Sequence, residues 1–346
     1  MKVFLLKPSS LGDVVQALPV LRLIKLHRPE AEVFWWLDAG LTTLLEGDPD
    51  LAGIIPFERQ RWSSPANWGG LWQTVRGLRA HKFDWVIDLQ SLARTGAFAW
   101  LADGAFTIGL DDGREGAPGF YDVAVPRPTP LTHAVDWYLQ VLPHLGVPVH
   151  RDFVWLPERP AVAEAVREKW DLGNEHWIAL QPGARWENKR WPVEHFAEMA
   201  ELCAKKFPDA RFAIFGTAAE REMGEFIASA VPGRSLNLAG SVSLLEMIEW
   251  LRLCAVMVSN DTGPMHVAAA LGKPVVALFG PTEPRRTGPY GQLGNVLQFA
   301  VPCAPCMKSV CHAEDKLECL HRITPWRVAE CVGGALAKEE PMPKRC

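Results

Sequence analysis

The sequence has no long apolar run, which excludes a membrane-spanning helix. A helix that crosses a bilayer needs roughly 20 mostly apolar residues, and the chain contains no such stretch. The apolar run near the N-terminus, Val3 to Leu6, is too short for the core of a signal peptide, and no cleavage site follows it. We therefore expect the chain to remain in the cytoplasm.

A strong net charge and internal repeats are also missing. The formal net charge is −4, so a basic surface that binds nucleic acid is not expected for the protein as a whole, although a local basic patch stays open. No solenoid period and no low-complexity tract is visible. The 346 residues are 48% hydrophobic and 22% charged, which is ordinary for a soluble chain long enough to form two domains.

The first half of the chain begins with an alternation of strand and helix patterns. Lys2 to Lys7 is a short apolar strand candidate, Val14 to His27 repeats apolar residues at helical spacing, and Glu32 to Leu37 is a second strand candidate. Such a β-α-β unit is typical of parallel sheets. Two further strands are predicted at 85–89 and 106–110.

The same rhythm restarts after Pro157. Apolar runs such as Val275 to Phe279 do not alternate with polar residues, as expected for strands covered on both faces. We predict strands at 177–180, 211–215, 255–258 and 274–279, and helices at 193–206, 220–230, 244–253 and 263–271.

The pattern predicts an α/β protein with two facing Rossmann-like domains, each with a parallel sheet, and a site in the cleft between them. The predicted domains are 1–155 and 156–325. A last helix starts at Thr324-Pro325, a helix N-cap followed by proline. We expect the segment 326–346 to pack back on the N-terminal domain.

Asp13 is the first candidate for chemistry. It follows the first strand, and sites in open parallel sheets form at the carboxyl ends of strands. A carboxylate there can act as a general base. A capping role at the start of the helix is at least as well supported by the spacing alone. The turn has no G-x-G-x-x-G, so no dinucleotide fingerprint is indicated.

Two loops in the second half have the properties of a phosphate site. The run Asn260 to His266 joins a strand to a helix, where backbone N–H groups and the helix dipole attract anions. The run Gln181 to Pro192 occupies a similar position and carries Lys189, which can neutralise a diphosphate. A capped helix and a solvated basic loop are the alternatives, and the presence of both loops in one half favours a shared diphosphate site.

Two further features are open to more than one interpretation. Glu220 can accept hydrogen bonds from a ribose or simply complement a helix N-terminus. The stretch from Arg59 to Lys82 mixes basic residues with tryptophans and no acidic residue, which fits an anionic membrane or a phosphorylated acceptor as well as a solvated face.

The cysteines fall into two groups. Cys203 and Cys254 lie in apolar patterns and are predicted to be buried thiols. Four others crowd into one loop with the spacing C-x2-C-x4-C-x7-C, which is compatible with a structural metal but matches no common zinc ribbon. These four are Cys303, Cys306, Cys311 and Cys319.

Five blocks of sequence together resemble glycosyltransferase family nine, the ADP-heptose:lipopolysaccharide heptosyltransferases. The blocks run in family order, and the Ser-Ser-Leu-Gly-Asp form is more similar to heptosyltransferase I than to II. They are KPSSLGDVVQALP at 7–19, DLQSLARTG at 88–96, GREG at 113–116, QPGARWENKRWP at 181–192 and SNDTGPMHVAAALGKPVVALFGPTEP at 259–284.

The resemblance implies a GT-B fold and an inverting transfer of heptose. ADP-L-glycero-D-manno-heptose would bind the C-terminal half, and the Kdo-containing inner core on lipid A would approach the N-terminal half. Asp13 would be the general base, with Lys189 the second catalytic residue. The donor residues would be Gly183, Arg185, Lys189, Glu220, Asp261, Thr262, Gly263 and His266, and the acceptor or heptose residues Ser10, Gly12, Arg59, Arg61 and Arg114.

No cofactor and no catalytic metal are expected, because no D-x-D motif stands at a plausible site. Peripheral contact with the cytoplasmic face of the inner membrane is expected, and nucleic acid is not expected as a partner. Two other classes stay open: another GT-B glycosyltransferase or a nucleotide-sugar epimerase with a different donor, and a non-catalytic nucleotide-sugar-binding protein. Comparing ADP with UDP binding addresses the first, and a donor-turnover assay addresses the second.

Overall fold

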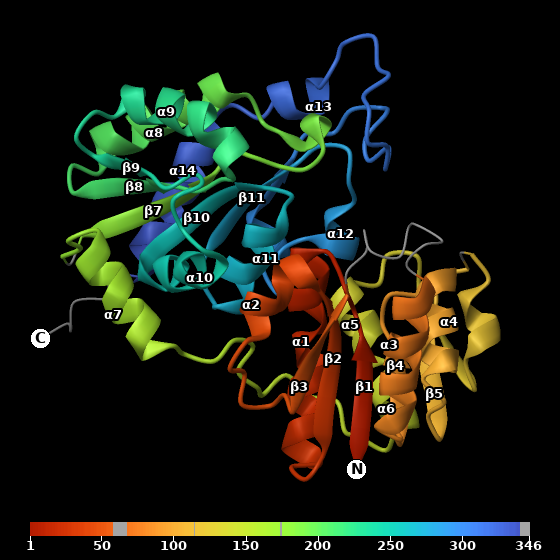
Figure 1. Cartoon of the computed structure of the whole chain (residues 1–346). Coiled ribbons are helices and arrows are strands. Elements are labelled where there is room, and N and C mark those ends of the chain that lie inside the picture. The colour runs from red at the N-terminus through yellow and green to blue at the C-terminus, as the bar shows by residue number, and fades with distance from the viewer. Residues whose placement is uncertain (58–67, 114, 174, 340–346) are drawn as a thin grey trace, which may run out of the picture. The chain divides into compact units, whose positions relative to one another are not determined.

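The chain forms two compact units, Met1–Pro157 and Glu158–Cys346. The computed structural model describes residues 1–57, 68–113, 115–173 and 175–339. Figure 1 shows the elements coloured along the chain, and each unit is an α/β arrangement around its own sheet. No helix among the described residues is long and apolar enough to cross a membrane.

The sheet of the first unit is parallel throughout, with the strand order β3-β2-β1-β4-β5-β6. The strands are β1 (Lys2–Leu6), β2 (Glu32–Asp38), β3 (Gly53–Phe57), β4 (Trp85–Asp88), β5 (Phe106–Asp111) and β6 (Val123–Pro126). The helices are α1 (Leu11–His27), α2 (Thr42–Leu45), α3 (Trp68–Ala80), α4 (Ala93–Leu101), α5 (Ala134–Leu139) and α6 (Val141–His144), with 3-10 turns at Ala39–Leu41 and Ala117–Phe120.

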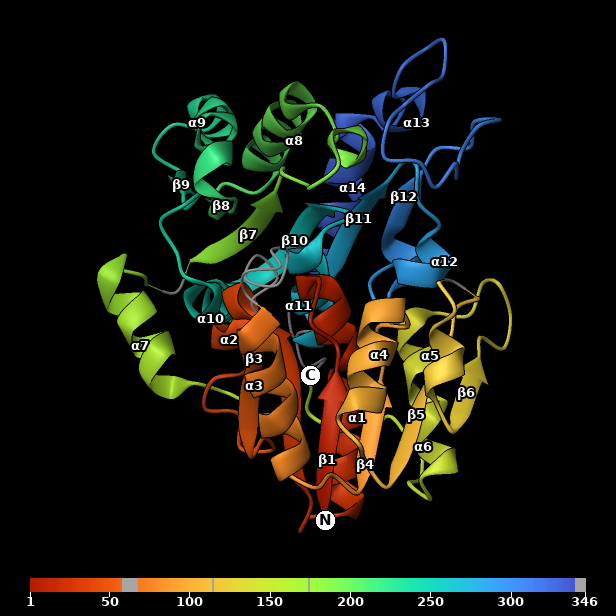
Figure 2. The ribbon, with the colours of Figure 1, turned by 45° about the vertical axis from the view of Figure 1, so that its right-hand side comes forward.

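Helices cover both faces of this first sheet. Phe4 and Leu6 of β1 pack in one apolar cluster with Leu78 of α3 and Ala99 of α4. Figure 2 shows α3 and α4 on the viewer's side of the strands. Helix α1 packs with α5. Since alternate residues of a strand face opposite sides of the sheet, the complete burial of β1 from Val3 to Leu6 follows from this double cover.

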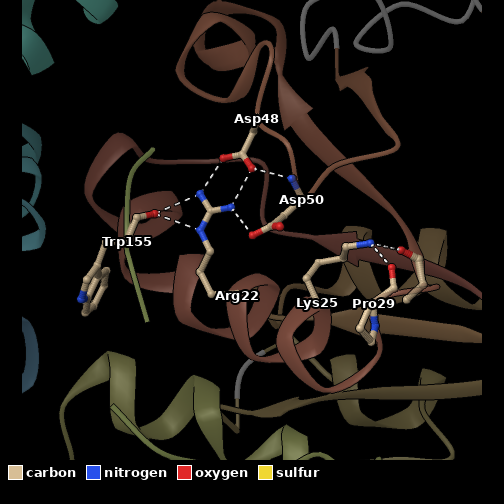
Figure 3. Close-up of polar contacts among 7 residues, drawn as sticks. Arg22, Lys25, Pro29, Asp48, Asp50 and Trp155 are labelled. Carbon is tan, nitrogen blue, oxygen red and sulfur yellow. Dashed lines mark hydrogen bonds and ion pairs between the residues drawn. The ribbon is translucent and has the colours of Figure 1, made fainter. Parts of the chain in front are cut away.

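A buried arginine fixes the end of the first unit. Arg22 of α1 donates to both carboxylate oxygens of Asp48 at 2.6 and 2.5 Å and to Asp50 at 2.7 Å. It also donates twice to the carbonyl oxygen of Trp155, at 3.1 and 3.0 Å, as Figure 3 shows. Nearby, Lys25 donates to the carbonyl oxygens of Pro29 and Ala31 beyond the end of α1. Because a buried guanidinium needs all of its partners, the segment at Trp155 is held on α1.

The second unit repeats the same topology, with the order β12-β11-β10-β7-β8-β9 and parallel pairing. The strands are β7 (His176–Gln181), β8 (Ala210–Ile214), β9 (Ser235–Asn237), β10 (Cys254–Asn260), β11 (Val275–Phe279) and β12 (Val296–Gln298). The helices are α7 (Pro160–Lys169), α8 (Val193–Lys206), α9 (Arg221–Ala230), α10 (Leu244–Leu253), α11 (Gly263–Ala270), α12 (Pro284–Thr287), α13 (Glu318–His321) and α14 (Pro325–Glu339). Its 3-10 turns are Glu187–Lys189, Ala218–Glu220 and Leu293–Asn295.

That the segment 326–346 packs back on the N-terminal domain stays a prediction, and its residues 340–346 lie outside the described residues. Within the second unit, α14 packs on α8 and against β10 and β11. Val328 and Val332, one helical turn apart, lie in the same apolar cluster as Phe196 and Met199 of α8. This stripe completes the cover over one face of the second sheet, and its burial accounts for the position of α14.

Candidate active site

Three predicted residues of the first unit, Ser10, Gly12 and Asp13, follow β1 at the carboxyl edge of the sheet. Ser10 is the N-cap of α1 and Asp13 stands three residues later, in a capping box. Both the backbone N–H and the hydroxyl of Ser10 donate to Asp13 Oδ2, at 3.0 and 2.7 Å. Gly12 is buried beside them. Asp13 therefore caps helix α1 in the structure. The same two hydrogen bonds also fix the orientation of its carboxylate, as a general base would require.

A buried lysine lies at the start of this loop, a residue that sequence reasoning did not single out. Lys7 is 3% exposed, and its Nζ donates to the carbonyl oxygen of Leu89 at 2.9 Å and lies 4.7 Å from the centre of the Tyr138 ring. Burial lowers the pKa of Lys7, but Tyr138, Asp13 and Asp88 raise it, and the net direction is upward. The ammonium group is thus a permanent positive charge near Asp13.

Asp88, at the end of β4, completes the polar edge of this sheet. Its carboxylate accepts from the N–H groups of Gln90 and Ser91 at 2.8 and 3.3 Å, and from the hydroxyl of Tyr121 at 2.8 Å. Complete burial raises the pKa of Asp88, and burial followed by the Asp88 charge raises the pKa of Tyr121. Lys7 is the first residue of the sequence block 7–19, and Asp88 is the first residue of the block 88–96. Their places in these two blocks were the sequence signal that could have identified both residues.

In the second unit, Lys189 and Asp261 are brought together from two loops. Lys189 Nζ lies 2.6 Å from Asp261 Oδ2, and its side chain is 18% exposed against 7% for Asp261. The hydroxyl of buried Thr282 donates to the same oxygen at 2.7 Å. Thr282 follows β11 and was not predicted as a site residue. The two donors leave Asp261 as a carboxylate that orients Lys189.

Asn260 ties the loops 181–192 and 260–266, proposed below to bind the donor and called the donor loops, together at the point where the order of the second sheet reverses. Its Oδ1 accepts from the N–H of Trp191 at 3.0 Å, and its Nδ2 donates to the carbonyl oxygen of Pro182 at 2.7 Å. These loops follow β10 and β7, which are neighbours in the sheet although α8, β8, α9, β9 and α10 separate them in sequence. Ligands of open α/β sheets bind at such switch points.

The start of α11 provides the remaining polar groups of this edge. Thr262 is the N-cap of α11, its hydroxyl does not cap the helix, and Gly263 and Pro264 are its first residues. His266 is buried, one turn further on. The N–H groups of a helix N-terminus attract phosphate. The start of α11 and the ammonium group of Lys189 therefore both present positive charge at the carboxyl edge of the second sheet.

Glu220 and Gly183 are in direct contact. The Glu220 carboxylate accepts from the N–H and the hydroxyl of Thr217, at 2.7 and 3.1 Å, in a second capping box. A Cβ placed on Gly183 would lie 2.0 Å from Glu220 Oε1. Gly183 therefore makes room for the Glu220 carboxylate next to the donor loop, whereas Arg185 in the same loop is exposed.

Three predicted residues, Arg59, Arg61 and Arg114, lie outside the described residues. The cysteine predictions have mixed outcomes. Cys203 and Cys254 are buried, as predicted. Among the described residues, no group of three or more histidine, cysteine, aspartate or glutamate side chains is arranged to hold a metal ion. A structural metal in the cysteine loop therefore stays a prediction without support from this geometry.

A cavity of about 570 Å³ lies at the opposite edge of the second sheet, around His176 and Ala210, where β7 and β8 begin. It contains none of the predicted residues. Because sites in parallel sheets form where strands end rather than where they begin, we do not assign the chemistry to this cavity.

Comparison with known proteins supports the family resemblance found in the sequence. Residues 71–317 match glycosyltransferase family 9 (heptosyltransferase). The chain is 31% identical to lipopolysaccharide heptosyltransferase 1 of Pseudomonas aeruginosa, over 99% of this chain and 100% of that protein. It is 27% identical to lipopolysaccharide heptosyltransferase 2 of Escherichia coli, over 98% of this chain and 100% of that protein.

Solved structures agree with the fold. The structure of the E. coli ADP-heptose LPS heptosyltransferase II aligns with a TM-score of 0.79 and 24% identity, covering 99% of this chain and 100% of that one. The structure of a family 9 glycosyltransferase from Veillonella parvula aligns with a TM-score of 0.80 and 23% identity, over 97% of each chain. The predicted α/β class with two parallel-sheet domains of the GT-B type is confirmed. The chain belongs to glycosyltransferase family 9, the heptosyltransferases.

Proposed function

We propose that this enzyme transfers heptose from ADP-L-glycero-D-manno-heptose to the Kdo-containing inner core of lipid A. The observation that carries the proposal is the Lys189–Asp261 pair, held at 2.6 Å beside the N-terminus of α11. A diphosphate is the group of the donor that needs a cation and helix N–H groups at one edge. The names of the relatives, among them lipopolysaccharide heptosyltransferase 1, support the choice of sugar and acceptor.

The reaction is a one-step inverting transfer in which Asp13 acts as the base. An acceptor hydroxyl gives its proton to the Asp13 carboxylate while its oxygen attacks the anomeric carbon, and the bond from that carbon to the diphosphate breaks. ADP leaves with the negative charge. Lys189 and the N–H groups at Thr262 and Gly263 stabilise that charge as it develops. Glu220 supplies a carboxylate for the ribose hydroxyl groups.

The proposed acceptor surface is in the first unit, on helices α3 and α4. Trp72 of α3 and Trp100 of α4 are 63% and 61% exposed. Arg76 and Arg79 are exposed on α3, four and seven residues after Trp72, so these three side chains share a face of the helix. Arg79 also donates to the carbonyl oxygen of Leu101 at 2.9 Å, which brings it to the end of α4. Tryptophans with arginines suit the anionic surface of a membrane.

We infer from this surface a peripheral contact with the cytoplasmic face of the inner membrane, with Arg59, Arg61 and Arg114 also assigned to the acceptor or heptose. The decisive experiment is a turnover assay with ADP-heptose and Kdo-lipid A, together with calorimetric titrations of ADP and UDP. We expect heptose transfer with inversion at the anomeric carbon, and tighter binding of ADP than of UDP. Tighter binding of UDP, or hydrolysis of the donor without transfer, would contradict the proposal.

A further inference from the structure

The segment from Val301 to Cys319, here called the cysteine loop, contacts the loop 181–192 and the loop after β11 through hydrogen bonds to backbone atoms. The side-chain Nδ2 of Asn188 donates to the carbonyl oxygen of Lys308 at 2.8 Å. The N–H of Met307 donates to the carbonyl oxygen of Pro281 at 2.7 Å. Asn188 immediately precedes Lys189, and Pro281 immediately precedes Thr282. Each contact is therefore one residue away from the Lys189–Asp261–Thr282 cluster.

These contacts surround a cavity of about 200 Å³. Asn188 is only 5% exposed, and its Oδ1 has no hydrogen-bond partner among the described residues. The side chains that line the cavity include Asn188, Pro281 and the four cysteines of the loop, Cys303, Cys306, Cys311 and Cys319. Burial, and then the neighbouring thiols of Cys303, Cys311 and Cys306, raise the pKa of Cys319 to about 11. The four thiols and Asn188 thus line one cavity.

The position of Asn188 couples this space to the donor site. Asn188 belongs to the 3-10 turn Glu187–Lys189, so its side chain and the side chain of Lys189 leave the same short turn. Its single bond to Lys308 anchors that turn on the cysteine loop. On the side of Thr282, the N–H of Met307 in the cysteine loop holds the carbonyl oxygen of Pro281. Gln298 also donates to the carbonyl oxygen of Thr282 at 2.8 Å. A shift of the cysteine loop would therefore move both partners of Asp261.

We propose that the cysteine loop braces the donor site, with Asn188 as the positioning residue, so that modification of its thiols and binding of the donor diphosphate oppose each other. This inference rests on the proposed function, because it takes the Lys189–Asp261 pair as the diphosphate site. Two binding events that disfavour each other do so by the same factor in either direction. An added group in the cavity weakens ADP binding, and bound ADP protects the thiols.

The first test is the substitution Asn188→Ala. We expect the dissociation constant for ADP to rise about two- to tenfold, the range for one lost hydrogen bond. The matched control is Gln292→Ala. Gln292 donates to the carbonyl oxygen of Lys273 and accepts from the N–H of Val275, at the beginning of β11 and away from the donor loops. The control should lower the melting temperature and leave ADP affinity unchanged. Equal ADP affinity in Asn188→Ala and the unmodified protein would overturn the proposal that the cysteine loop positions the donor site through Asn188.

The second test follows thiol labelling and does not depend on the stability of a variant. N-ethylmaleimide adds a thiolate across its carbon–carbon double bond, the new carbanion takes a proton from water, and no group leaves. We expect ADP to slow the labelling of half-buried Cys306 and Cys311, read peptide by peptide in a mass spectrometer. Half-buried Cys331 on α14 is the internal control and should react at the same rate with and without ADP.

The outcomes separate this inference from the proposed function. Labelled protein should bind ADP more weakly than unlabelled protein, and Asn188→Ala should lose the protection of Cys306 and Cys311. If ADP binds and the labelling rates of Cys306 and Cys311 do not change, the role proposed for the cysteine loop is overturned and the proposed function is not. Failure of the unmodified protein to bind ADP would overturn the proposed function and the brace together.

Discussion

The carboxyl edges of the two sheets have the same strand order but arrange their charged side chains differently. In the first unit the edge carries Asp13 and the fully buried Asp88, each oriented by hydroxyl and N–H donors, and the buried Lys7 lies at the start of the same loop as Asp13. In the second unit it displays a cation, Lys189, oriented by Asp261. Since the topology is shared, the difference comes from side chains placed in equivalent loops. In the proposed function, the first edge accepts a proton and the second holds the diphosphate.

The largest effect is expected from Asp13→Ala, which removes the proposed base from the first edge. Heptose transfer should fall by about 10²–10⁴-fold, the usual contribution of a general base, while ADP affinity in the second unit stays the same. Steady-state kinetics and calorimetry measure the two quantities.

The capping role of Asp13 needs its own controls. Asp13→Asn keeps the shape of the side chain but accepts no proton, so it should lose activity with a smaller loss of stability. Ser243→Ala removes a comparable cap from α10, where Ser243 accepts from the N–H of Glu246, and should cost about 0.5–2 kcal/mol without a specific loss of turnover. Full activity in Asp13→Asn would refute the assignment.

Lys189→Ala should remove the cation from the second edge. ADP binding is expected to weaken by about 1.5–3 kcal/mol, the range for a hydrogen bond to a charged group, and transfer should slow. Lys205→Ala is the control, because the Lys205 side chain is 75% exposed on α8 and pairs only loosely with Glu201 at 3.8 Å. If calorimetry finds the same ADP affinity in Lys189→Ala and Lys205→Ala, this edge does not bind the donor.

Gly183→Ala tests whether the contact with Glu220 matters. The new Cβ would lie 2.0 Å from Glu220 Oε1, so the carboxylate must move and lose its bonds to Thr217. We expect a stability loss of about 1 kcal/mol, as for one broken capping interaction, and a higher KM for the donor. In Gly334→Ala on α14 the added methyl meets nothing within 4 Å, so this control should be neutral or slightly stabilising. An unchanged donor KM would remove Glu220 from the site.

The smallest effect is expected on the acceptor surface of the first unit. Trp72→Ala with Arg76→Gln should reduce binding to vesicles of anionic lipid and raise the acceptor KM, with ADP affinity unchanged. A basic side chain near such a surface contributes about 1 kcal/mol, which salt screens. Arg167→Gln on exposed α7 is the charge-matched control. Co-sedimentation equal to that of the control would identify α3 as an ordinary solvated face.

Local pattern was enough to predict the elements that build the two edges. Three strands, which end before Ser10, Pro182 and Asp261, and the helices that follow them are short-range features. The spacing of their apolar residues and their turn residues is visible within a few positions of the sequence. The sequence blocks at 181–192 and 259–284 also carried the family resemblance, which the comparisons confirm. Weakly patterned edge strands, such as β9 (Ser235–Asn237), gave no such signal.

Long-range contacts decided the rest. The sequence by itself determined two α/β halves and placed Asp13 and Lys189 at strand ends. Only the tertiary structure decided that Thr282 shares an oxygen of Asp261, that Gly183 admits the carboxylate of Glu220, and that α14 packs on α8. The physical reason is that periodicity records which face of an element is apolar, whereas the partner of that face is set by which elements together exclude water from one core.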